Sequence, residues 1–589
     1  MAPYIPEEFT QDEQAVLRRY VTNLDLPVFA LVNLPEVVKG ALFARYSRSA
    51  KSLRRLFLDE FVGELDVTGD ATIDATVGLR RAEKLYQRVF FEYGDDSVAQ
   101  LGGVHLACEQ SSNVLTKVLE RGRLMSYLEQ STRYIAYDQR LPSGHYRYHR
   151  PPEILESPLG ARYVGDMDRM FDGYGALLLR LVAWLSTRYP RQPGDSDFVH
   201  RQAIKAKALD AARGLLPAAS LSNVGIYGDG QAYEGLLLRM AAHPLPEVRA
   251  YGAMMLTELR KVIPSFLQRV DIPDRGGDWA AYLAATREDT ARVVERLWPE
   301  RAGGRGTIVV GGRTGGGGAP EDTGMAEDTG MAEDGGMAED TGMAGSGGAP
   351  EDGGPQVRLL DFDSDAEDKV LAAICFPHGA VSELEALARV RALSAEDRRA
   401  LFEAYVGERK NRRHRPGRAF ERTGYRFEIV TDYGAFRDLQ RHRILTVDWQ
   451  PLSTGLGYDV PDLIVEAGEA RAFTETMERS HALYDALAPV FPAQAQYAVA
   501  LAFRVRYVMQ MNAREAMHVI ELRSGTQGHP SYRSVAQEMH RLIAEEAGHR
   551  LIAEAMVHLD RSPAGLERLD AERQAEARRS RVARSDGFA

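Results

Sequence analysis

Apolar residues recur at every third or fourth position along most of the chain, which is the spacing of one face of an α-helix. The longest stretches of this kind are residues 169–189, 251–270 and 534–559. Segments with the two-residue alternation of a β-strand are fewer, and the clearest are residues 104–110 and 425–431. The pattern therefore predicts an α+β fold that is rich in helices.

The two ends of the chain repeat the same order of elements, which indicates an internal duplication. Residues 52–64 (SLRRLFLDEFVGE) and 397–408 (DRRALFEAYVGE) align as one helix present twice. In each half a strand, a helix and an Arg-x-Arg triplet then follow. Three dipeptides come next in both halves: Ser131–Thr132, Tyr137–Asp138 and His243–Pro244 in the first, and Ser453–Thr454, Tyr458–Asp459 and His529–Pro530 in the second. We therefore predict two copies of one domain in tandem, residues 1–301 and residues 357–578.

Residues 302–356 separate the two halves with a glycine-rich segment that contains a six-residue repeat of the type GMAEDT. Five Glu-Asp pairs in this segment account for nearly all of the formal net charge of −11. The segment has too few large apolar residues to offset the entropy lost on ordering, so we predict a disordered linker. Calcium binding by the acidic pairs is the alternative. Residues 579–589 are predicted to form a flexible tail.

The cysteine count and the hydropathy exclude several classes of protein. With only two cysteines, Cys108 and Cys375, the chain has neither a disulfide framework nor a four-cysteine zinc site. This usage fits a reducing, cytoplasmic setting. The sequence has no run of about 18 apolar residues and no basic leader before an apolar segment, so we expect neither membrane insertion nor export.

Two clusters of polar residues could carry chemistry. The first, residues 121–134 (RGRLMSYLEQSTRY), combines arginines and hydroxyls suited to binding an anion such as a phosphate. A solvated, ion-paired helix end is the alternative for this cluster. The second cluster joins residues 438–459 to a helix at residues 511–523 (MNAREAMHVIELR), where Asn512, Arg514, His518 and Arg523 form a polar face. A polar, cationic face on an otherwise apolar helix meets either water or a charged ligand, and we favour a ligand.

These residues resemble the flavin-dependent thymidylate synthases, whose signature is Arg-His-Arg, seven residues, then Ser-x-Arg-Tyr. The first half keeps this spacing from Arg121 to Ser131-Thr132-Arg133-Tyr134, but Gly122 stands in place of the histidine. The second half keeps Arg441-His442-Arg443 and the helix, whereas its serine is displaced to Ser453 and no arginine follows two residues later. Each half retains what the other has lost.

The resemblance implies roles for individual residues. Ser131 and Arg133 would hold the phosphate of dUMP, and Arg523 would lie against the uracil as the catalytic residue. The implied substrate-binding set is Arg121, Arg123, Glu129, Ser131, Arg133, Arg441 and Arg523, and the implied FAD-binding set is His442, Arg443, Asn512, Arg514 and His518. No metal is implied. Because family sites are assembled across the subunits of a homotetramer, we predict a hybrid site with its phosphate loop from one half and its flavin surface from the other.

The implied reaction is the reductive methylation of dUMP to dTMP, with methylenetetrahydrofolate as the carbon donor, NADPH as the reductant and FAD as the cofactor. The flavin carries the redox chemistry, so the protein has to supply orientation and charge rather than a nucleophile. This agrees with Cys108 and Cys375, neither of which has the exposed, electropositive setting of a nucleophilic cysteine. The implied partner is a small nucleotide rather than a nucleic acid or a membrane, and we expect a homodimer that mimics the family's tetramer.

Three alternatives stay open from the sequence alone. The basic segment at residues 407–418 (GERKNRRHRPGR) could bind RNA, could face FAD or could be a solvated patch. Glu546 and His549 have the spacing of half a di-iron site, although no second such pair is present. The lost histidine, the displaced serine and the missing arginine also allow a relative that binds a flavin or nucleotide without thymidylate synthesis, as a binder or scaffold.

Overall fold

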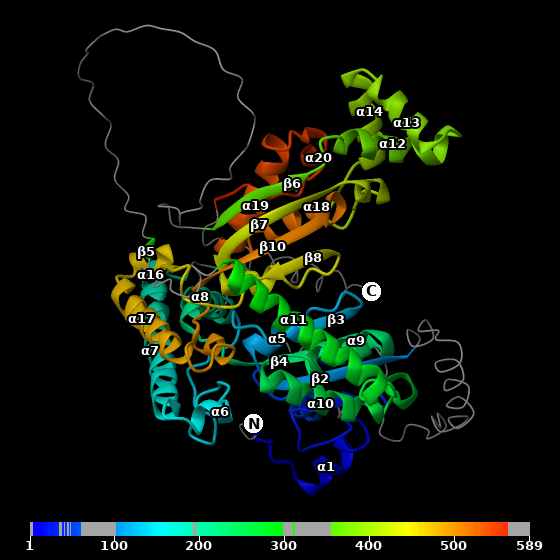
Figure 1. The fold of residues 1–589 in the computed structure, drawn as a ribbon. Coiled ribbons are helices and arrows are strands. Elements are labelled where there is room, and N and C mark those ends of the chain that lie inside the picture. Colours follow the sequence, from blue (N-terminus) through cyan, green and yellow to red (C-terminus); the bar gives the residue numbers. More distant parts are fainter. Residues whose placement is uncertain are drawn as a thin grey trace, which may run out of the picture.

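Two four-stranded antiparallel sheets form the centre of the molecule, one in each half of the chain (Figure 1). The computed structural model describes residues 4–34, 38–39, 42–43, 46, 49–60, 102–191, 197–298, 310–311 and 355–563. The first sheet has the order β1 (Val28–Leu31), β2 (Gly103–Ser112), β4 (Leu221–Asp229), β3 (Met125–Glu129). The second has the order β6 (Gln356–Phe362), β7 (Gly424–Asp432), β10 (Arg504–Asn512), β8 (Leu445–Trp449). The two sheets have the same strand order, which confirms the predicted tandem fold, and β2 and β7 are the two strands predicted from alternation.

Each sheet is followed by helices in matching positions. They are α5 (Asn113–Leu119) after β2 and α15 (Tyr433–Leu439) after β7, α9 (Gly230–Ala241) after β4 and α18 (Ala513–Arg523) after β10, then α10 (Pro246–Arg260) and α19 (Pro530–Glu545). The last residue of each of these strands caps the following helix, its side chain accepting from a backbone N–H of the first turn. The capping residues are Ser112, Asp229, Asp432 and Asn512. Side-chain caps of this type fix where each helix begins.

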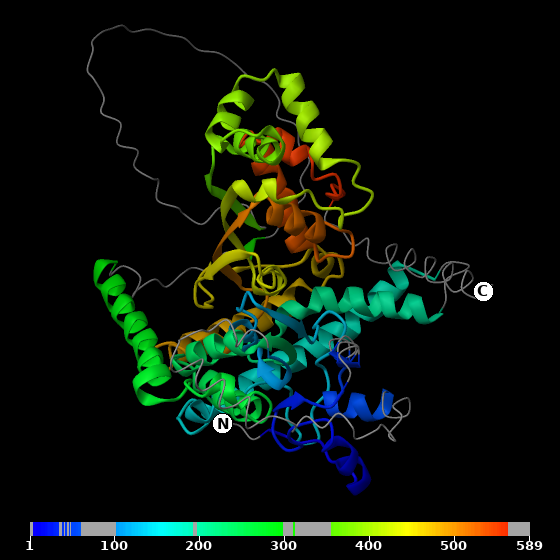
Figure 2. The ribbon, with the colours of Figure 1, turned by 90° about the vertical axis from the view of Figure 1, so that its right-hand side faces the viewer.

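The remaining helices cover the outside of the molecule. Those of the first half are α1 (Gln11–Leu17), α3 (Leu53–Glu60), α6 (Pro152–Leu155), α7 (Gly160–Arg188), α8 (Asp197–Ala212) and α11 (Asp278–Leu297). Those of the second half are α12 (Ala366–Gly379), α13 (Glu383–Arg391), α14 (Ala395–Val406), α16 (Asp462–Glu466), α17 (Ala470–Leu487) and α20 (Arg550–Glu554). The helices α12–α14 lie at the end of the molecule farthest from the first half (Figure 2). Among the described residues, no helix combines the length and the apolar character needed to cross a membrane.

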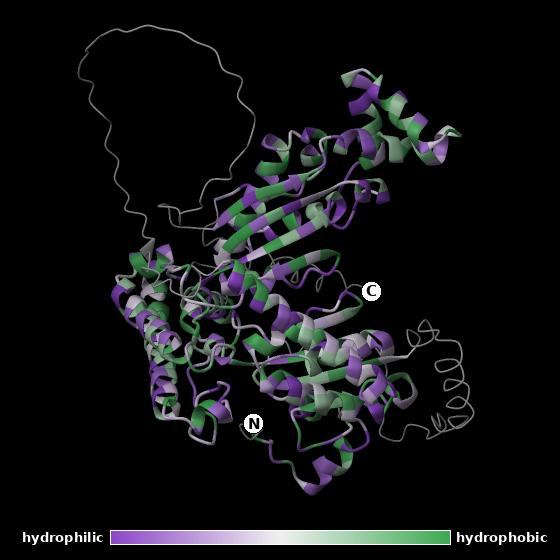
Figure 3. Ribbon diagram, viewed as in Figure 1, coloured by the Kyte–Doolittle hydropathy of each residue, from purple (hydrophilic) through white to green (hydrophobic). Residues whose placement is uncertain are grey.

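The two halves share one continuous core. Buried residues of both halves, such as Leu215, Tyr233, Phe436 and Leu501, belong to a single apolar cluster. Figure 3 shows apolar residues alternating with polar ones along the strands of the second sheet, as expected when one face of a sheet is buried. The protein is therefore a fused pair of domains rather than two independent units.

A reciprocal set of contacts joins the two halves. The Ala218 amide donates to the Val499 carbonyl (2.8 Å), and the Leu501 amide donates to the Leu216 carbonyl (2.9 Å). Because β4 and β10 correspond, these two hydrogen bonds are equivalent under exchange of the halves. The helices α7 and α17 also pack side by side, with an ion pair between Arg180 and Glu469 (2.7 Å). The joint thus approximates the two-fold interface of a symmetric dimer.

Two helices predicted from periodicity end earlier than expected. The stretch at residues 251–270 leaves the helix after Arg260, because Ile263 precedes Pro264 and is driven out of the helical region. The stretch at residues 534–559 is interrupted at Gly548, which has a left-handed φ of 71°. Glu546 caps the end of α19 and His549 precedes α20, so the two residues do not share a helix and the half di-iron interpretation is wrong.

The predicted linker falls almost wholly outside the described residues. Of residues 302–356, the structure describes the short strand β5 (Val310–Gly311), which pairs in parallel with β9 (Tyr458–Asp459), and residues 355–356 at the start of β6. The tail at residues 579–589 and the last four residues of the predicted helix 52–64 also lie outside the described residues.

Candidate functional site

Arg133 extends from the loop after β3 in the first half into the second half. Its guanidinium donates to both carboxylate oxygens of Asp210 (2.7 and 2.8 Å) and to the Tyr532 hydroxyl (2.9 Å). It also donates to the Gln527 carbonyl (3.1 Å). Ser131 shapes the turn beneath it, because the Ser131 Oγ accepts from the Arg133 amide (3.3 Å). The phosphate loop predicted in the first half therefore ends among residues of the second half.

Arg523, the last residue of α18, approaches the same place from the second half. Its Nε lies 2.9 Å from the Nε2 of His442, and a second nitrogen donates to the Asp438 carbonyl. The Arg523 guanidinium carbon lies 5.6 Å from the ring centre of Tyr532, and that of Arg133 lies 5.9 Å from the same ring. The buried Tyr532 ring is the surface on which the predicted substrate residues of the two halves meet.

A buried carboxylate, Asp438, is shared by several of these arginines. It pairs with Arg441, with Arg213 (3.6 Å) and with Arg523 (3.8 Å). Burial alone would raise the pKa of Asp438, but the neighbouring guanidinium groups, Arg133 among them, hold that pKa far below its usual range. Asp438 is therefore ionised at every physiological pH.

The cluster carries more positive than negative charge. Four guanidinium groups (Arg133, Arg213, Arg441 and Arg523) face the carboxylates of Asp210 and Asp438, and a third carboxylate, Asp432, lies beside Arg213. Within the described residues, two buried nitrogens of the cluster, Arg213 Nη2 and Arg441 Nε, have no hydrogen-bond partner. A buried donor without a partner costs about 1–3 kcal/mol, so the site is suited to an anion that would satisfy both nitrogens.

A second group, His442, Glu515 and His518, adjoins this cluster. The two imidazole rings lie 5.3 Å apart at a steep angle, and the His442 Nδ1 lies 3.4 Å from a Glu515 oxygen. Burial lowers the pKa of His442 well below its usual range and that of His518 to about 4, and it raises the pKa of Glu515 to about 7. Both histidines are therefore neutral at pH 7.

These three side chains could converge on a metal ion, because their ligand atoms lie within 4.8 Å of one another. The surrounding charge opposes a cation, however. The Arg415 Nη2 lies 3.0 Å from the His518 Nδ1, and Arg523 contacts the Nε2 of His442. Arginine donors already occupy one nitrogen of each ring, so this pocket of neutral imidazoles is better suited to a neutral or anionic group than to a metal.

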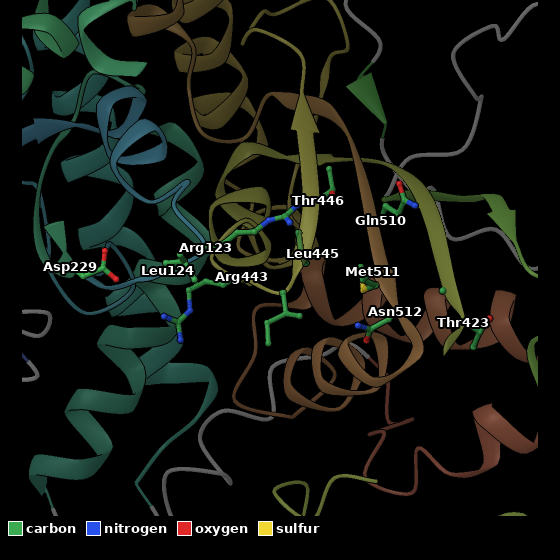
Figure 4. A pocket seen from close by; sticks show the side chains of 12 residues that line it. Arg123, Leu124, Asp229, Thr423, Arg443, Leu445, Thr446, Gln510, Met511 and Asn512 are labelled. Carbon is green, nitrogen blue, oxygen red and sulfur yellow. Dashed lines mark hydrogen bonds between the residues drawn. The ribbon is translucent and has the colours of Figure 1, made fainter. Parts of the chain in front are cut away.

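A cavity of about 920 Å³ opens beside these residues at the joint between the halves. Figure 4 shows the side chains that line it, with Arg123 extending toward Thr446. The lining residues are Arg123, Leu124, Asp229, Thr423, Gly424, Arg443, Ile444, Leu445, Thr446, Gln510, Met511 and Asn512. Arg443 and Asn512, both predicted to contact a cofactor, face this cavity. Its volume is in the range of small-molecule and cofactor sites.

Several residues predicted to bind the substrate or the cofactor do not approach Arg133. They instead make contacts between the two halves of the chain. Arg121 pairs with Asp448 (3.1 Å) and Arg123 donates to Thr446 (2.8 Å), both at exposed positions. Arg443, from the second half, donates to the Ser126 Oγ of the first half (3.0 Å). The buried Glu129 pairs with Lys117 (3.2 Å) and with Arg437 (2.6 Å) from the other half.

Arg514 lies at the edge of the site. Its Nε donates to the Pro416 carbonyl (2.9 Å), and its guanidinium lies 3.4 Å from Glu421. It therefore holds the segment before β7 against the start of α18.

Sequence reasoning missed Asp210, Arg213, Asp438, Tyr532 and Glu515. Asp438 and Glu515 each lie within three residues of a predicted site residue, so their neighbourhood was a usable signal. Asp210 and Tyr532 have no such signal, because only the fold brings α8 and α19 to the phosphate loop.

The missing histidine of the first half has a local explanation, since a Cβ at Gly122 would lie 2.6 Å from the Tyr127 hydroxyl.

The corresponding place in the first half has a different chemistry. There Glu247, at the start of α10, accepts from the Ser112 amide (2.9 Å), the Ser112 hydroxyl (2.7 Å) and the Tyr497 hydroxyl (2.8 Å). All four residues of this network, including His149 at 3.7 Å from Glu247, are buried. A buried carboxylate with satisfied donors leaves no place for a second anion.

The chain is similar to several known proteins along most of its length. The chain is 37% identical over 537 residues to a UPF0159 protein of Chlamydia muridarum (90% of this chain, 92% of the relative). It is 30% identical over 561 residues to the UPF0159 protein Ta1429 of Thermoplasma acidophilum (91% and 97%). A flavin-dependent thymidylate synthase of Clostridium tetani is 24% identical over 185 residues (31% and 68%).

Among solved structures, a UMP/dUMP methylase, PolB from Streptomyces cacaoi, bound with 5-Br dUMP, aligns with 35% of this chain and 95% of its own. It does so at 18% identity and a TM-score of 0.29. The family model described as thymidylate synthase complementing protein matches residues 43–265 and 358–547, one segment in each half. The chain therefore belongs to the family of thymidylate synthase complementing proteins.

Proposed function

We propose that this protein is a flavin-dependent thymidylate synthase that methylates dUMP reductively to dTMP. Methylenetetrahydrofolate would supply the carbon and NADPH the reducing equivalents. The observation that carries the proposal is the meeting of Arg133 and Arg523 on Tyr532, with His442 in contact with Arg523. This is the hybrid site implied by the complementary losses of the two halves.

The charge of the cluster supports dUMP as the substrate. A phosphate monoester carries close to two negative charges at pH 7 and accepts several hydrogen bonds. The cluster has more guanidinium groups than carboxylates, which favours an anion, and the unpaired nitrogens of Arg213 and Arg441 supply donors. Arg133 would exchange one carboxylate contact for the phosphate, while Asp438 keeps Arg441 and Arg523 in place.

The chemistry of the donors supports FAD as the cofactor. The cavity at the joint combines the amide of Asn512 and the guanidinium of Arg443 with apolar walls such as Ile444 and Met511. Neutral imidazoles at His442 and His518 can lie against an uncharged ring without a desolvated charge. Together with Arg514 these residues would hold the flavin, which when bound supplies the redox chemistry. Arg523, in contact with His442, is placed to polarise a uracil carbonyl and to stabilise the negative charge that develops on it.

The first experiment is the visible absorption spectrum of the purified protein with added FAD, before and after titration with dUMP. The expected result is a bound flavin whose spectrum changes on adding dUMP, followed by NADPH oxidation that depends on dUMP and methylenetetrahydrofolate. If no flavin is retained and dUMP changes nothing, the proposal fails. A flavin that does not respond to dUMP would indicate a different substrate.

A binder without turnover is the second candidate, and one observation favours it. Asp210 engages Arg133 through two hydrogen bonds, so the phosphate loop is held closed by a buried ion pair. A nucleotide must displace that carboxylate to bind. Saturable dUMP binding with no dTMP formed in the presence of both co-substrates would support this candidate.

We also propose that the protein forms a homodimer, and sedimentation equilibrium tests this oligomeric state.

A further inference from the structure

The basic segment at residues 407–418 forms a structured loop beside the candidate site, and we name it the basic loop. It leaves α14 at Gly407, whose φ of 61° favours glycine. Four of its cationic side chains, Lys410, Arg412, Arg413 and Arg415, are exposed. We propose that this loop binds the oligoglutamate tail of a folate co-substrate, an acidic peptide of γ-linked glutamates. The inference rests on the proposed function and adds a second binding surface to it.

The basic loop is fixed at both ends, which separates it from an ordinary solvated charge run. Arg409, only 7% exposed, makes two hydrogen bonds to the buried Glu521 of α18 (2.7 and 2.6 Å). At the other end the Pro416 carbonyl accepts from Arg514 (2.9 Å). Both anchors lie on the helix that carries His518 and Arg523. The loop therefore holds a constant position relative to the candidate site.

Internal hydrogen bonds also hold the loop in shape. The Arg409 Nε donates to the His414 carbonyl (2.5 Å), and the Asn411 Oδ1 accepts from the Arg413 amide (2.9 Å). The Asn411 amide nitrogen lies 3.0 Å from the His414 ring. These bonds gather the cationic side chains on one ordered loop, a charge distribution that attracts an anion.

Three exposed bases of the loop have no acidic partner among the described residues. Within the part of the chain that the structure describes, Lys410, Arg412 and Arg413 take part in no ion pair, whereas Arg418 pairs with Glu421 (3.1 Å). Arg415 lies closest to the candidate site, in contact with His518. The positive charge thus begins at the predicted flavin surface and extends outward along the loop.

The position of the loop decides which anion it suits. Among the described residues, the cavity is lined by Thr423, Gly424 and Asn512 but by none of residues 407–418. A ligand seated in the cavity would reach the loop only through a part that extends beyond the cavity, and the charge of the loop favours an acidic part. Methylenetetrahydrofolate ends in glutamate and can carry a chain of them, which places one carboxylate on each unit. A nucleic acid fits less well, because the loop has no phenylalanine, tyrosine or tryptophan on which a base could stack, and its one imidazole, His414, is held by Asn411.

The test compares folates with one and with five glutamates. Binding of each to the FAD- and dUMP-loaded protein is measured by calorimetry at low salt. The wild type is expected to bind the pentaglutamate form about tenfold more tightly, since several exposed ion pairs of modest strength add up. The difference should shrink as salt is added, because exposed charges are screened over about 8 Å at physiological ionic strength.

The variant K410Q/R412Q/R413Q removes three bases that contact neither the cavity nor the arginine cluster. It is expected to lose the preference for the pentaglutamate form and to bind the monoglutamate form as the wild type does. The matched control is R287Q/R292Q/R296Q, which removes the same charge from α11, a helix without buried residues. The control should keep the tenfold preference.

Equal affinity of the wild type for both folates would overturn the proposal, and so would an equal loss in the control. A fluorescent penta-γ-glutamate peptide, measured on the protein without co-substrates, separates this proposal from the proposed function. Loop-dependent binding of the peptide supports the tail site even if no folate binds and no dTMP forms. If the peptide does not bind, or a single-stranded oligonucleotide of equal charge binds more tightly through the loop, the tail site is refuted.

Discussion

The duplicated chain has two corresponding regions where a strand, its following helix and a later helix meet, and their chemistry is opposite. At the end of β7, Asp432 caps α15 and accepts from the hydroxyl of Ser531 on α19. At the end of β2, Ser112 caps α5 and donates to Glu247 on α10. The hydroxyl and the carboxylate have exchanged places between the two regions.

The consequence of this exchange is that one region is closed and the other is open to an anion. Glu247 has its donors in place, with Tyr497 supplied by the other half. The region beside Asp432 instead contains the arginine cluster, with unpaired nitrogens on Arg213 and Arg441. A fused pair can specialise in this way because one copy can lose binding while it still contributes structure. The four predictions that follow test the comparison, from the largest expected effect to the smallest.

The largest effect is expected from removing an arginine of the open region. Arg133→Ala and Arg523→Ala should each weaken dUMP binding by about a hundredfold or more, because each removes one partner of a buried charge pair worth about 3 kcal/mol. Titration of the flavin spectrum measures this. Arg121→Ala, an exposed arginine at the joint, is the control and should change the affinity less than threefold. Binding that survives either buried substitution would contradict the hybrid site.

Glu247→Gln should act on stability and not on the nucleotide. One carboxylate oxygen of Glu247 accepts from the Ser112 amide and the other accepts from the Ser112 and Tyr497 hydroxyls. Glutamine has a single acceptor oxygen and cannot serve both sides, so we expect a loss of about 2 kcal/mol in the free energy of unfolding. Urea denaturation measures the loss, with the slope of the transition as a check on two-state behaviour. The affinity of the folded variant for dUMP should equal that of the wild type. A parallel loss of nucleotide affinity would show that the two regions are coupled.

Glu515 should give the stability of the protein a pH dependence that the equivalent position of the first half cannot give. Burial raises the pKa of Glu515 to about 7, whereas the third residue of α9, which corresponds to it, is Ala232. Because the folded pKa exceeds the unfolded one, this group's contribution to stability is present below about pH 4.5 and is lost as the pH rises through 7. Glu515→Gln should abolish that loss, on the order of 2 kcal/mol. If the stabilities of wild type and variant run parallel from pH 5 to 8, the assignment is wrong.

The smallest effect is expected on FAD affinity, from a comparison of two arginines at equivalent positions between the halves. Arg123 and Arg443 each donate to a hydroxyl of the other half, and both line the cavity. Only Arg443 belongs to the half that keeps the histidine and the asparagine expected to face FAD. Arg443→Ala should weaken FAD binding about tenfold, as expected for the loss of a hydrogen bond to a charged group, whereas Arg123→Ala should change it less than threefold. Equal losses, measured by flavin fluorescence, would contradict a cofactor surface formed by one half.

The sequence predicted the two-fold repeat because the duplication preserves local signals. The alternation in residues 425–431 and the helical period of α7 each depend on residues near in the chain, so they could be seen without the structure. The helix at residues 534–559 was overextended because its apolar period continues across Gly548, where the backbone requires a left-handed conformation.

The partners of the site residues could not be predicted in this way. Glu129 fits a motif for binding substrate, yet in the structure its carboxylate is committed to Lys117 and Arg437. Nothing near Arg133 in the chain indicates Asp210 or Tyr532, which are 77 and 399 residues away. Contacts over such separations depend on how the sheets pack, and local patterns carry no information about them.

The sequence by itself determined the family, the tandem organisation and which half kept which part of the signature, because these are properties of residue order and spacing. Only the tertiary structure brings Arg133 of the first half and Arg523 of the second half together on Tyr532, because they meet there only when the reciprocal joint is formed. It also decided that the other region is closed, because the donors to Glu247 come from both halves. The physical reason is that burial and charge pairing, which set the chemistry of a site, depend on distances in space.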